Sequence, residues 1–164
     1  MSAHHRRLMR LEPLPELVEG DQDSVRCPLP EDRLALAQLM LDSCRGSVDD
    51  EGEDLAGSLR EVDSLFASEY GDWLPSFSGI VELNGRPAAA TLVTRWRNAP
   101  FIAFSLTHPD FRRRGLARRG LLRVIHALRA ADDTCLQLVV TRGNTPAERL
   151  YEALGFVEVD RPAT

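Results

Sequence analysis

Apolar residues in the first half of the chain recur mostly at the spacing of a helix. In residues 30–44 they fall three and four positions apart, with two acids in the first turn, and this pattern predicts a helix that ends at Gly46. A second stripe of the same kind predicts a helix over residues 53–69. The preceding segment is less regular, and we expect only short strands there, at residues 7–11 and 24–27.

From residue 77 onward the pattern changes to that of strands. Residues 77–83 and 87–96 flank Asn84-Gly85, which favours a type I′ turn and so predicts a β-hairpin. The sequence then predicts a strand, a helix, a strand, a helix and a last strand, at residues 101–107, 116–131, 135–141, 146–154 and 156–159. This order is typical of an α/β (α+β) fold with at least one parallel pair of strands.

Composition narrows the class of protein. The 164 residues, 43% of them hydrophobic, suit a single domain over residues 1–164 with its own core. No apolar run approaches the roughly 20 residues that cross a bilayer, and the polar start lacks the apolar segment of a signal peptide, so we expect a cytoplasmic protein without a membrane partner. The net charge of −5 argues against a nucleic-acid partner. The three cysteines lack the spacing of a zinc site, so we expect no metal.

Charge is distributed unevenly along the chain. All twenty basic residues are arginine, and seven of them lie in residues 111–130, a segment without an acid. Residues 42–72 contain ten acids and two arginines. We therefore expect an anion-binding site in the first segment, whereas the second would attract a cation.

The arginine-rich segment begins where a predicted strand passes through a loop into a predicted helix. The first turn of a helix has backbone N–H groups without partners, at the positive end of the helix dipole. Gly115 would let the backbone approach an anion closely, and the small Ala117 would let the helix pack tightly on the sheet. The pattern predicts a phosphate-binding loop, and a solvated arginine surface is the alternative.

A second group of polar residues precedes and follows the start of the helix at residues 146–154. Thr145 and Glu148 have the spacing of a capping box, with Pro146 as the first helical residue. The amide of Asn144 would then be free to bind a ligand, although a plain turn role is equally compatible with the pattern. Tyr151 lies on the apolar stripe of this helix, so a core role is its alternative.

Taken together, these motifs resemble those of the GCN5-related N-acetyltransferase (GNAT) family. The resemblance rests on Arg112-x-x-Gly115-x-Ala117 and, about thirty residues later, on Asn144-x-x-Ala147-x-x-Leu150-Tyr151-x-x-x-Gly155-Phe156. It implies a mixed, mostly antiparallel central sheet with a parallel splayed pair and helices on both faces. Residues 77–160 would form the acetyl-CoA-binding core, residues 29–76 the acceptor-side helices, and residues 1–28 an N-terminal arm.

The resemblance also implies a reaction and roles for particular residues. Acetyl-CoA would be the cosubstrate, and its acetyl group would pass to a primary amine by direct attack. The pyrophosphate would be held by Arg112, Arg113, Arg114, Gly115, Leu116 and Ala117, and the pantetheine arm by Ser105, Leu106, Thr107 and Asn144. Tyr151 would donate a proton to the departing thiolate. A non-catalytic acyl-CoA-binding sensor or interaction module and a transferase of a larger acyl group are the alternatives.

One departure from the family pattern concerns the general base. Family members often carry a carboxylate on the strand before the phosphate loop, but residues 101–107 contain none. We expect Asp49, Asp50 and Glu51 of the acidic segment to hold a cationic small-molecule amine and to supply the base, with Glu82 as a further candidate. A solvated loop is the alternative.

A second departure concerns the last strand of the sheet. The chain ends at Thr164, soon after the strand predicted at residues 156–159, so the family's final strand is expected to be short or absent. An open sheet edge invites pairing with another chain. We therefore expect either an N-terminal strand or a second subunit of a homodimer to cover that edge.

Overall fold

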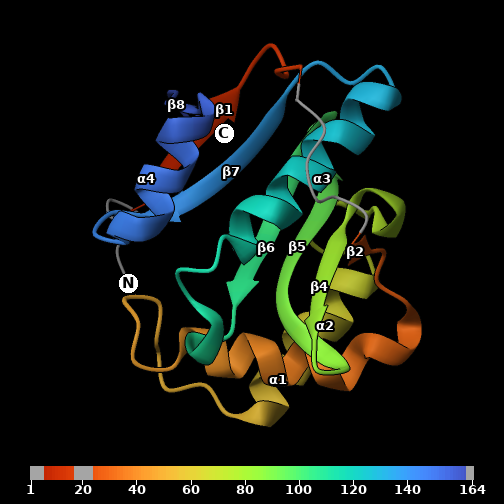
Figure 1. Ribbon diagram of the computed structural model, residues 1–164, viewed down its shortest axis with the longest axis vertical. Helices are drawn as coiled ribbons and strands as arrows, with labels where there is room; N and C mark the ends of the chain where they lie inside the picture. The colour runs from red at the N-terminus through yellow and green to blue at the C-terminus, as the bar shows by residue number, and fades with distance from the viewer. Residues whose placement is uncertain (1–5, 17–23, 162–164) are drawn as a thin grey trace.

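The computed structural model describes residues 6–16 and 24–161 and shows one mixed sheet between two layers of helices (Figure 1). The strands are β1 (Arg6–Leu11), β2 (Val25–Arg26), β3 (Asp72–Trp73), β4 (Gly79–Leu83), β5 (Arg86–Trp96), β6 (Ala99–Thr107), β7 (Leu136–Thr141) and β8 (Val157–Glu158). The helices are α1 (Arg33–Cys44), α2 (Leu55–Phe66), α3 (Leu116–Ala130) and α4 (Thr145–Leu154), and short 3-10 turns η2, η3 and η4 occupy Pro30–Asp32, Pro75–Phe77 and Pro109–Phe111.

The strands are ordered β2-β4-β5-β6-β7-β1-β8, with β3 paired to β5 beside this path. Among the described residues, β6 and β7 are the parallel pair, and the other paired strands are antiparallel. The parallel pair is joined only at Phe101–Gln137 and Ile102–Leu138. Beyond these residues the two strands diverge toward their carboxyl ends, as Figure 1 shows, and we call this opening the splay. The predicted fold class, including the splayed pair, is confirmed.

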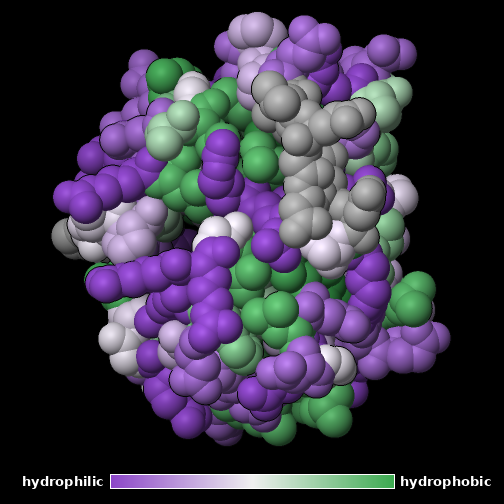
Figure 2. Space-filling model, viewed as in Figure 1, coloured by the Kyte–Doolittle hydropathy of each residue, from purple (hydrophilic) through white to green (hydrophobic). Residues whose placement is uncertain are grey.

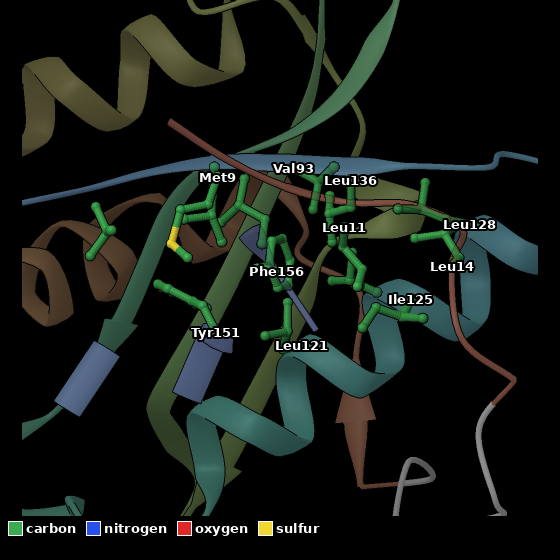
Figure 3. Packing of buried hydrophobic residues seen from close by; sticks show 14 residues of the cluster. Met9, Leu11, Leu14, Val93, Leu121, Ile125, Leu128, Leu136, Tyr151 and Phe156 are labelled. Carbon is green, nitrogen blue, oxygen red and sulfur yellow. The ribbon is translucent and has the colours of Figure 1, made fainter. Parts of the chain in front are cut away.

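Helices cover the two faces of the sheet through separate apolar clusters. One cluster joins α3 and α4 to β1, β6 and β7, and includes Leu121, Ile125, Tyr151 and Phe156 (Figure 3). The other packs α1 and α2 against β4, β5 and β6. Since both clusters meet the same central strands, the splay opens between the α3–α4 layer and the α1–α2 layer.

The sheet edge next to β7 is covered from within the chain. β1 pairs with β7 along its whole length, from Arg6–Thr141 to Leu11–Leu136, and β8 pairs with the other side of β1. Of the two alternatives that the sequence left open, the N-terminal strand is therefore confirmed. The last strand is short, as expected, with only Val157–Glu158 in strand conformation.

Local interactions move several boundaries from their predicted positions. The Asp54 carboxylate accepts a hydrogen bond from the Gly57 N–H, so α2 begins at Leu55, and it ends at Phe66, three residues short of the prediction. Residues 30–32 form a 3-10 turn before α1, and another 3-10 turn delays the start of β4 to Gly79. The two-residue strand β3 carries no alternating pattern and was not predicted.

β5 ends at Trp96 as predicted, whereas β6 starts at Ala99, two residues before the predicted position, because of the turn that connects them. Arg97 and Asn98 both have positive φ, as a type I′ turn requires, so the ladder between the two strands extends to Trp96–Ala99. Further along, Leu92 pairs with Phe104 and Val93 with Ile102, which leaves an extra residue in β6 at this point. This bulge reverses which face later β6 side chains occupy, so that Leu106 packs on the α1–α2 side.

Candidate active site

The loop between β6 and α3 is open to an anion. Gly115 precedes α3 with φ 73°, in the left-handed region, and a Cβ built on it would meet no atom within 4 Å. Among the described residues, the backbone N–H groups of Arg113 and Gly115 donate no hydrogen bond to another backbone group. Free N–H groups, the helix dipole and open space in front of a glycine together fit a phosphate group. We call residues 112–117 the cradle.

The arginines of the cradle are held differently from one another. Arg112 donates through Nη2 to the backbone oxygen of Ser43 at 3.1 Å, which ties the cradle to the end of α1. The Arg114 guanidinium lies 5.3 Å from the ring centre of Phe111. Arg113 is exposed and has positive φ. The charge at this rim is thus close to the open backbone of Gly115.

Close packing of α3 on the sheet depends on a residue that the sequence analysis did not select. A Cβ on Gly120 would lie 2.7 Å from Oγ1 of Thr91 in β5, so a larger side chain would push the helix away. The prediction gave this role to Ala117, which is half-buried one turn earlier. Glycine destabilises the interior of a helix, so its presence there is a sequence signal that the helix closely approaches another element at that point.

Tyr151 projects from α4 into the apolar cluster beside the splay. Its ring packs edge-to-face on Phe156 with 5.6 Å between centres, as Figure 3 shows. Burial raises the pKa of the Tyr151 phenol above its usual value, an interaction with the Ser105 side chain opposes the rise, and the charge of Asp49 adds to it. The phenol is therefore protonated at neutral pH, and it lies close to a hydroxyl of β6.

Asp49 comes from the loop between α1 and α2 and reaches the end of β7. Its Oδ1 accepts a hydrogen bond from Oγ1 of Thr141 at 2.6 Å. Asp49 is half-buried, and its charge acts on Tyr151. Thr141 thus binds Asp49, and both Asp49 and Ser105 lie near enough to Tyr151 to influence its pKa. We call these four residues the splay cluster. Thr141 was not predicted as a site residue, and its position at the end of a strand was its only sequence indication of a functional role.

Asn144 lies at the start of α4 and is half-buried. It is the N-cap residue, but its side chain makes no capping hydrogen bond. The predicted capping box of Thr145 and Glu148 is wrong, because Thr145 is already helical and the Glu148 carboxylate binds Arg7 at 3.2 Å. The Asn144 amide is nevertheless left without a capping role, as the sequence analysis expected.

The remaining acidic candidates lie outside the splay cluster. Asp50 accepts hydrogen bonds from the N–H groups of Gly46 and Gly52, so it closes its own loop. Glu51 is exposed. Glu82, on β4, accepts from Nε of Arg26 at 2.7 Å, two strands away from β6 in the sheet.

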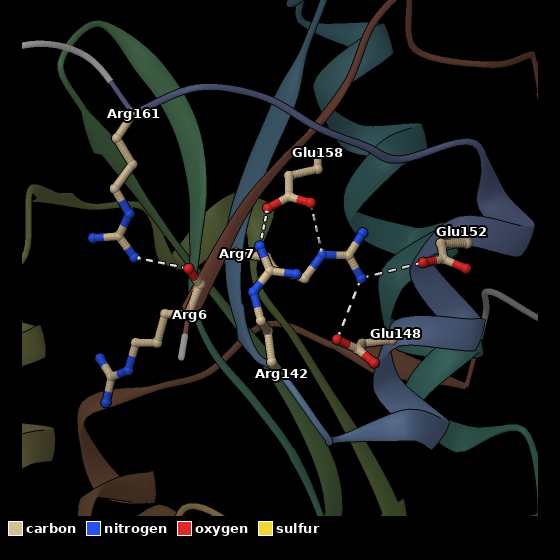
Figure 4. Close-up of polar contacts among 7 residues, drawn as sticks. All are labelled: Arg6, Arg7, Arg142, Glu148, Glu152, Glu158 and Arg161. Atoms are coloured by element: carbon tan, nitrogen blue, oxygen red, sulfur yellow. Dashed lines mark hydrogen bonds and ion pairs between the residues drawn. The ribbon is translucent and has the colours of Figure 1, made fainter. Parts of the chain in front are cut away.

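An ionic cluster fixes α4, and with it Tyr151, to the N-terminal strand. Arg7 of β1 contacts the carboxylates of Glu148, Glu152 and Glu158, each at 3.2 Å (Figure 4). Glu148 and Glu152 lie three residues before and one residue after Tyr151 on α4. No local pattern indicates this contact, because Arg7 and its partners on α4 lie about 140 positions apart in the chain.

The surface on the α3 side is hollowed between the two arms of the splayed sheet, and hydrophilic side chains lie on both rims (Figure 2). In residues 6–16 and 24–161, no three His, Cys, Asp or Glu side chains are grouped so as to hold a metal ion. No helix in these two ranges has the length and apolar character that a membrane span needs.

Solved structures with this fold include several enzymes. A GNAT-family protein from Novosphingobium aromaticivorans has a TM-score of 0.65 at 24% identity, over 94% of this chain and 61% of its own. A GCN5-related N-acetyltransferase from Sphaerobacter thermophilus has a TM-score of 0.67 at 19% identity, over 94% and 48%. The aminoglycoside N-acetyltransferase AAC(6')-Iy, bound to the bisubstrate analogue CoA-S-monomethyl-acetylneamine, has a TM-score of 0.63 at 17% identity, over 85% and 94%.

These likenesses concern the fold, and the chain spans only 61% and 48% of the lengths of the first two structures. No curated protein sequence matches this chain. The family model for the acetyltransferase (GNAT) family matches residues 35–156, which is most of the chain and includes both the cradle and Tyr151. The resemblance read from the sequence is thereby confirmed. The chain belongs to the acetyltransferase (GNAT) family.

Proposed function

We propose that this protein transfers the acetyl group of acetyl-CoA to a primary amine of a small molecule. One observation carries the proposal: a carboxylate, two hydroxyls and a buried phenol meet at the splay, next to an open phosphate-binding loop. The aminoglycoside acetyltransferase of the same fold holds a CoA-linked acceptor analogue, which supports a small molecule as the acceptor.

The cradle fits the pyrophosphate of acetyl-CoA. Free N–H groups at Arg113 and Gly115 supply donors, Leu116 and Ala117 continue them into the first turn of α3, and Arg114 adds its charge. From Ser105 to Thr107, β6 is paired with β5 only, so its other side offers backbone groups to the pantetheine arm. The Asn144 amide faces no capping partner and would bond the same arm.

Acetyl-CoA supplies an activated thioester, and the protein supplies the proton transfers. Tyr151 would donate its proton to the departing thiolate, since burial keeps the phenol protonated while Ser105 orients it. Asp49 would accept a proton from the ammonium group of the acceptor, and the neutral amine that results would attack the thioester carbonyl. β6 itself offers no carboxylate, whereas Asp49 reaches the splay. Thr141 holds the Asp49 carboxylate in place.

Thiol release from acetyl-CoA tests the proposal directly. The purified protein should release CoA thiol only when a primary amine is present, and mass spectrometry should show an amide product. A protein that binds acetyl-CoA but releases no thiol with any amine would be a sensor. A faster reaction with propionyl-CoA or a longer acyl-CoA would instead indicate transfer of a larger group.

A further inference from the structure

A pocket of about 440 Å³ lies near the splay on the α1–α2 side of the sheet. Its floor consists of Leu8, Val139 and Phe101, from the adjacent strands β1, β7 and β6. Leu138 and Val140 point into the α3–α4 cluster, so Val139 between them faces the opposite side. The volume lies in the range of small-molecule sites.

The pocket is close enough to the splay cluster for one small molecule to reach both. Val139 and Thr141 are two residues apart on β7 and point to the same face, so they are about 7 Å apart at the usual rise of a strand. Thr141 holds the Asp49 carboxylate. An acceptor whose amine binds Asp49 would therefore need a linker of about two or three bonds to place a ring above Val139.

The walls of the pocket are aromatic. Tyr70 follows α2, and Trp96 ends β5, with its ring centre 5.4 Å from that of Phe101. Tyr70 is fixed by an edge-on contact to Phe104 and by a hydrogen bond from its hydroxyl to Glu61 at 2.6 Å. Aromatic rings that are fixed in place around an apolar floor favour a flat apolar group of a ligand, which would be buried there and would contact the rings.

The charges around the pocket disfavour a polycation. Among the described residues that line the pocket, Glu69 is the only acid, whereas Arg97 and Arg161 are both basic. Arg97 is held 4.6 Å from the ring centre of Trp96, and Arg161 donates to the backbone oxygen of Arg6 at 3.4 Å. A polyamine or aminoglycoside would bring several ammonium groups against two guanidinium groups and one carboxylate.

We propose that this pocket binds the ring of the acceptor, and that the acceptor is a primary amine joined to an aromatic ring by a short chain. This inference rests on the proposed function for the position of the amine at Asp49. It narrows the expectation of a cationic small-molecule amine, raised by the acidic segment, to an amine with one charged end and an aromatic ring.

The two tryptophans of the chain allow binding to be measured without catalysis. In Trp73→Phe the remaining fluorophore is Trp96, which lines the pocket, whereas in Trp96→Phe it is Trp73, which stacks on Phe66 of α2. We expect 2-phenylethylamine to change the emission of Trp73→Phe in a saturable way and to leave that of Trp96→Phe unchanged. n-Propylamine, which lacks the ring, should change neither. An unchanged emission of Trp73→Phe, or an equal change in both variants, would overturn the inference.

Turnover gives the second measurement. We expect kcat/KM for 2-phenylethylamine to exceed that for n-propylamine and spermidine by at least tenfold, and Trp96→Leu to remove most of this ratio while Trp73→Leu keeps it. If Trp96→Leu does not fold, Tyr70→Leu replaces it. A preference for spermidine overturns the inference. Saturable binding without thiol release supports the pocket's ligand class and overturns the proposed catalysis alone, so the two failures are distinguishable.

Discussion

The hydroxyl of Thr141 donates a hydrogen bond to the carboxylate of Asp49, and this contact joins the loop between α1 and α2 to the open end of β7. It closes one side of the splay and brings a negative charge toward Tyr151. The hydrogen bond also orients a carboxylate whose proposed task is to receive a proton. Two segments about ninety residues apart in the chain thereby meet at the proposed reaction centre.

Replacing Asp49 separates its proposed role as a base from a structural role. Asp49→Asn keeps an oxygen that accepts from Thr141, so we expect unchanged thermal stability and acetyl-CoA affinity. Removal of the base should lower kcat by roughly 10² to 10⁴. Asp50→Asn is the control, since the Asp50 carboxylate accepts hydrogen bonds from two N–H groups of its own loop, and the kcat of this variant should stay within about twofold. Equal kcat values in the two variants would contradict the role of Asp49.

A charge placed in the cradle should prevent acetyl-CoA binding. In Gly115→Glu a side chain and a negative charge occupy the open space that the pyrophosphate needs, so calorimetry should detect no binding. Gly85→Glu is a matched control, because Gly85 has φ 77° and equally open surroundings but lies in the β4–β5 turn. Both variants carry the same strain, of about 1–2 kcal/mol, and only the first should lose acetyl-CoA. Normal binding by folded Gly115→Glu would remove the basis of the proposed function.

Local patterns were enough to place the cradle and α4. The strand, glycine and helix around Gly115 are adjacent in sequence, and Tyr151 lies on a stripe whose period sets its direction. The capping prediction failed at Thr145 because Glu148 has a better partner in Arg7, a charge from a distant strand. Competition of this kind depends on tertiary structure and leaves no local trace.

The parts of the site that depend on distant contacts were only partly accessible from the sequence. Asp49, Asp50 and Glu51 look alike as a run of acids, and only the packing of the loop against β7 selects Asp49. The aromatic pocket was not predicted, since Trp96 and Phe101 show only the pattern of a sheet. The bulge in β6, which turns Ser105 toward Tyr151, also has no sequence signature in a strand of mixed apolar residues.

The ionisation of tyrosine offers a prediction that requires no ligand. The chain contains two tyrosines. Burial and the neighbouring Glu61 raise the pKa of Tyr70 to about 12, and burial raises that of Tyr151. Absorbance at 295 nm should therefore show little phenolate in the folded protein at pH 10, where free tyrosine is about half ionised. Half ionisation at that pH would contradict both shifts.

The same shifts predict loss of stability at high pH. Each phenol keeps its proton in the folded state after the unfolded chain has lost it, so the unfolded state binds fewer protons above about pH 10. The free energy of unfolding should fall as the pH rises through this range. In Tyr70→Phe the fall should be smaller, and urea unfolding at pH 8 and pH 10.5 measures the difference. A steeper fall in Tyr70→Phe would contradict the prediction.

Tyr151→Phe tests the proposed general acid. The ring stays in the cluster beside Phe156, so stability and acetyl-CoA affinity should change little. Loss of the proton donor should lower kcat by roughly 10² to 10⁴. A leaving group of lower pKa needs less help from an acid, so the deficit should shrink with an acetyl thioester of an acidic thiol. A kcat within about threefold of the parent would make Tyr151 a core residue only.

The last prediction concerns the ionic cluster in which Arg7 of β1 binds Glu148 and Glu152 of α4 and Glu158. In Arg7→Met the apolar stem is retained, but Glu148, whose side chain is 19% exposed, and Glu152 lose this partner, while Glu158 keeps its ion pair with Arg142. We expect the free energy of unfolding to fall by about 1–3 kcal/mol, the usual cost of losing hydrogen bonds to charged groups that are partly buried. Arg33→Met is the control, because its ion pair with Asp63 is about half exposed on both sides and should matter little. Since Tyr151 lies between Glu148 and Glu152, Arg7→Met should also lower kcat more than it raises KM for the amine. Equal losses of stability in the two variants would mean that the ionic cluster around Arg7 contributes no more than an ordinary surface ion pair.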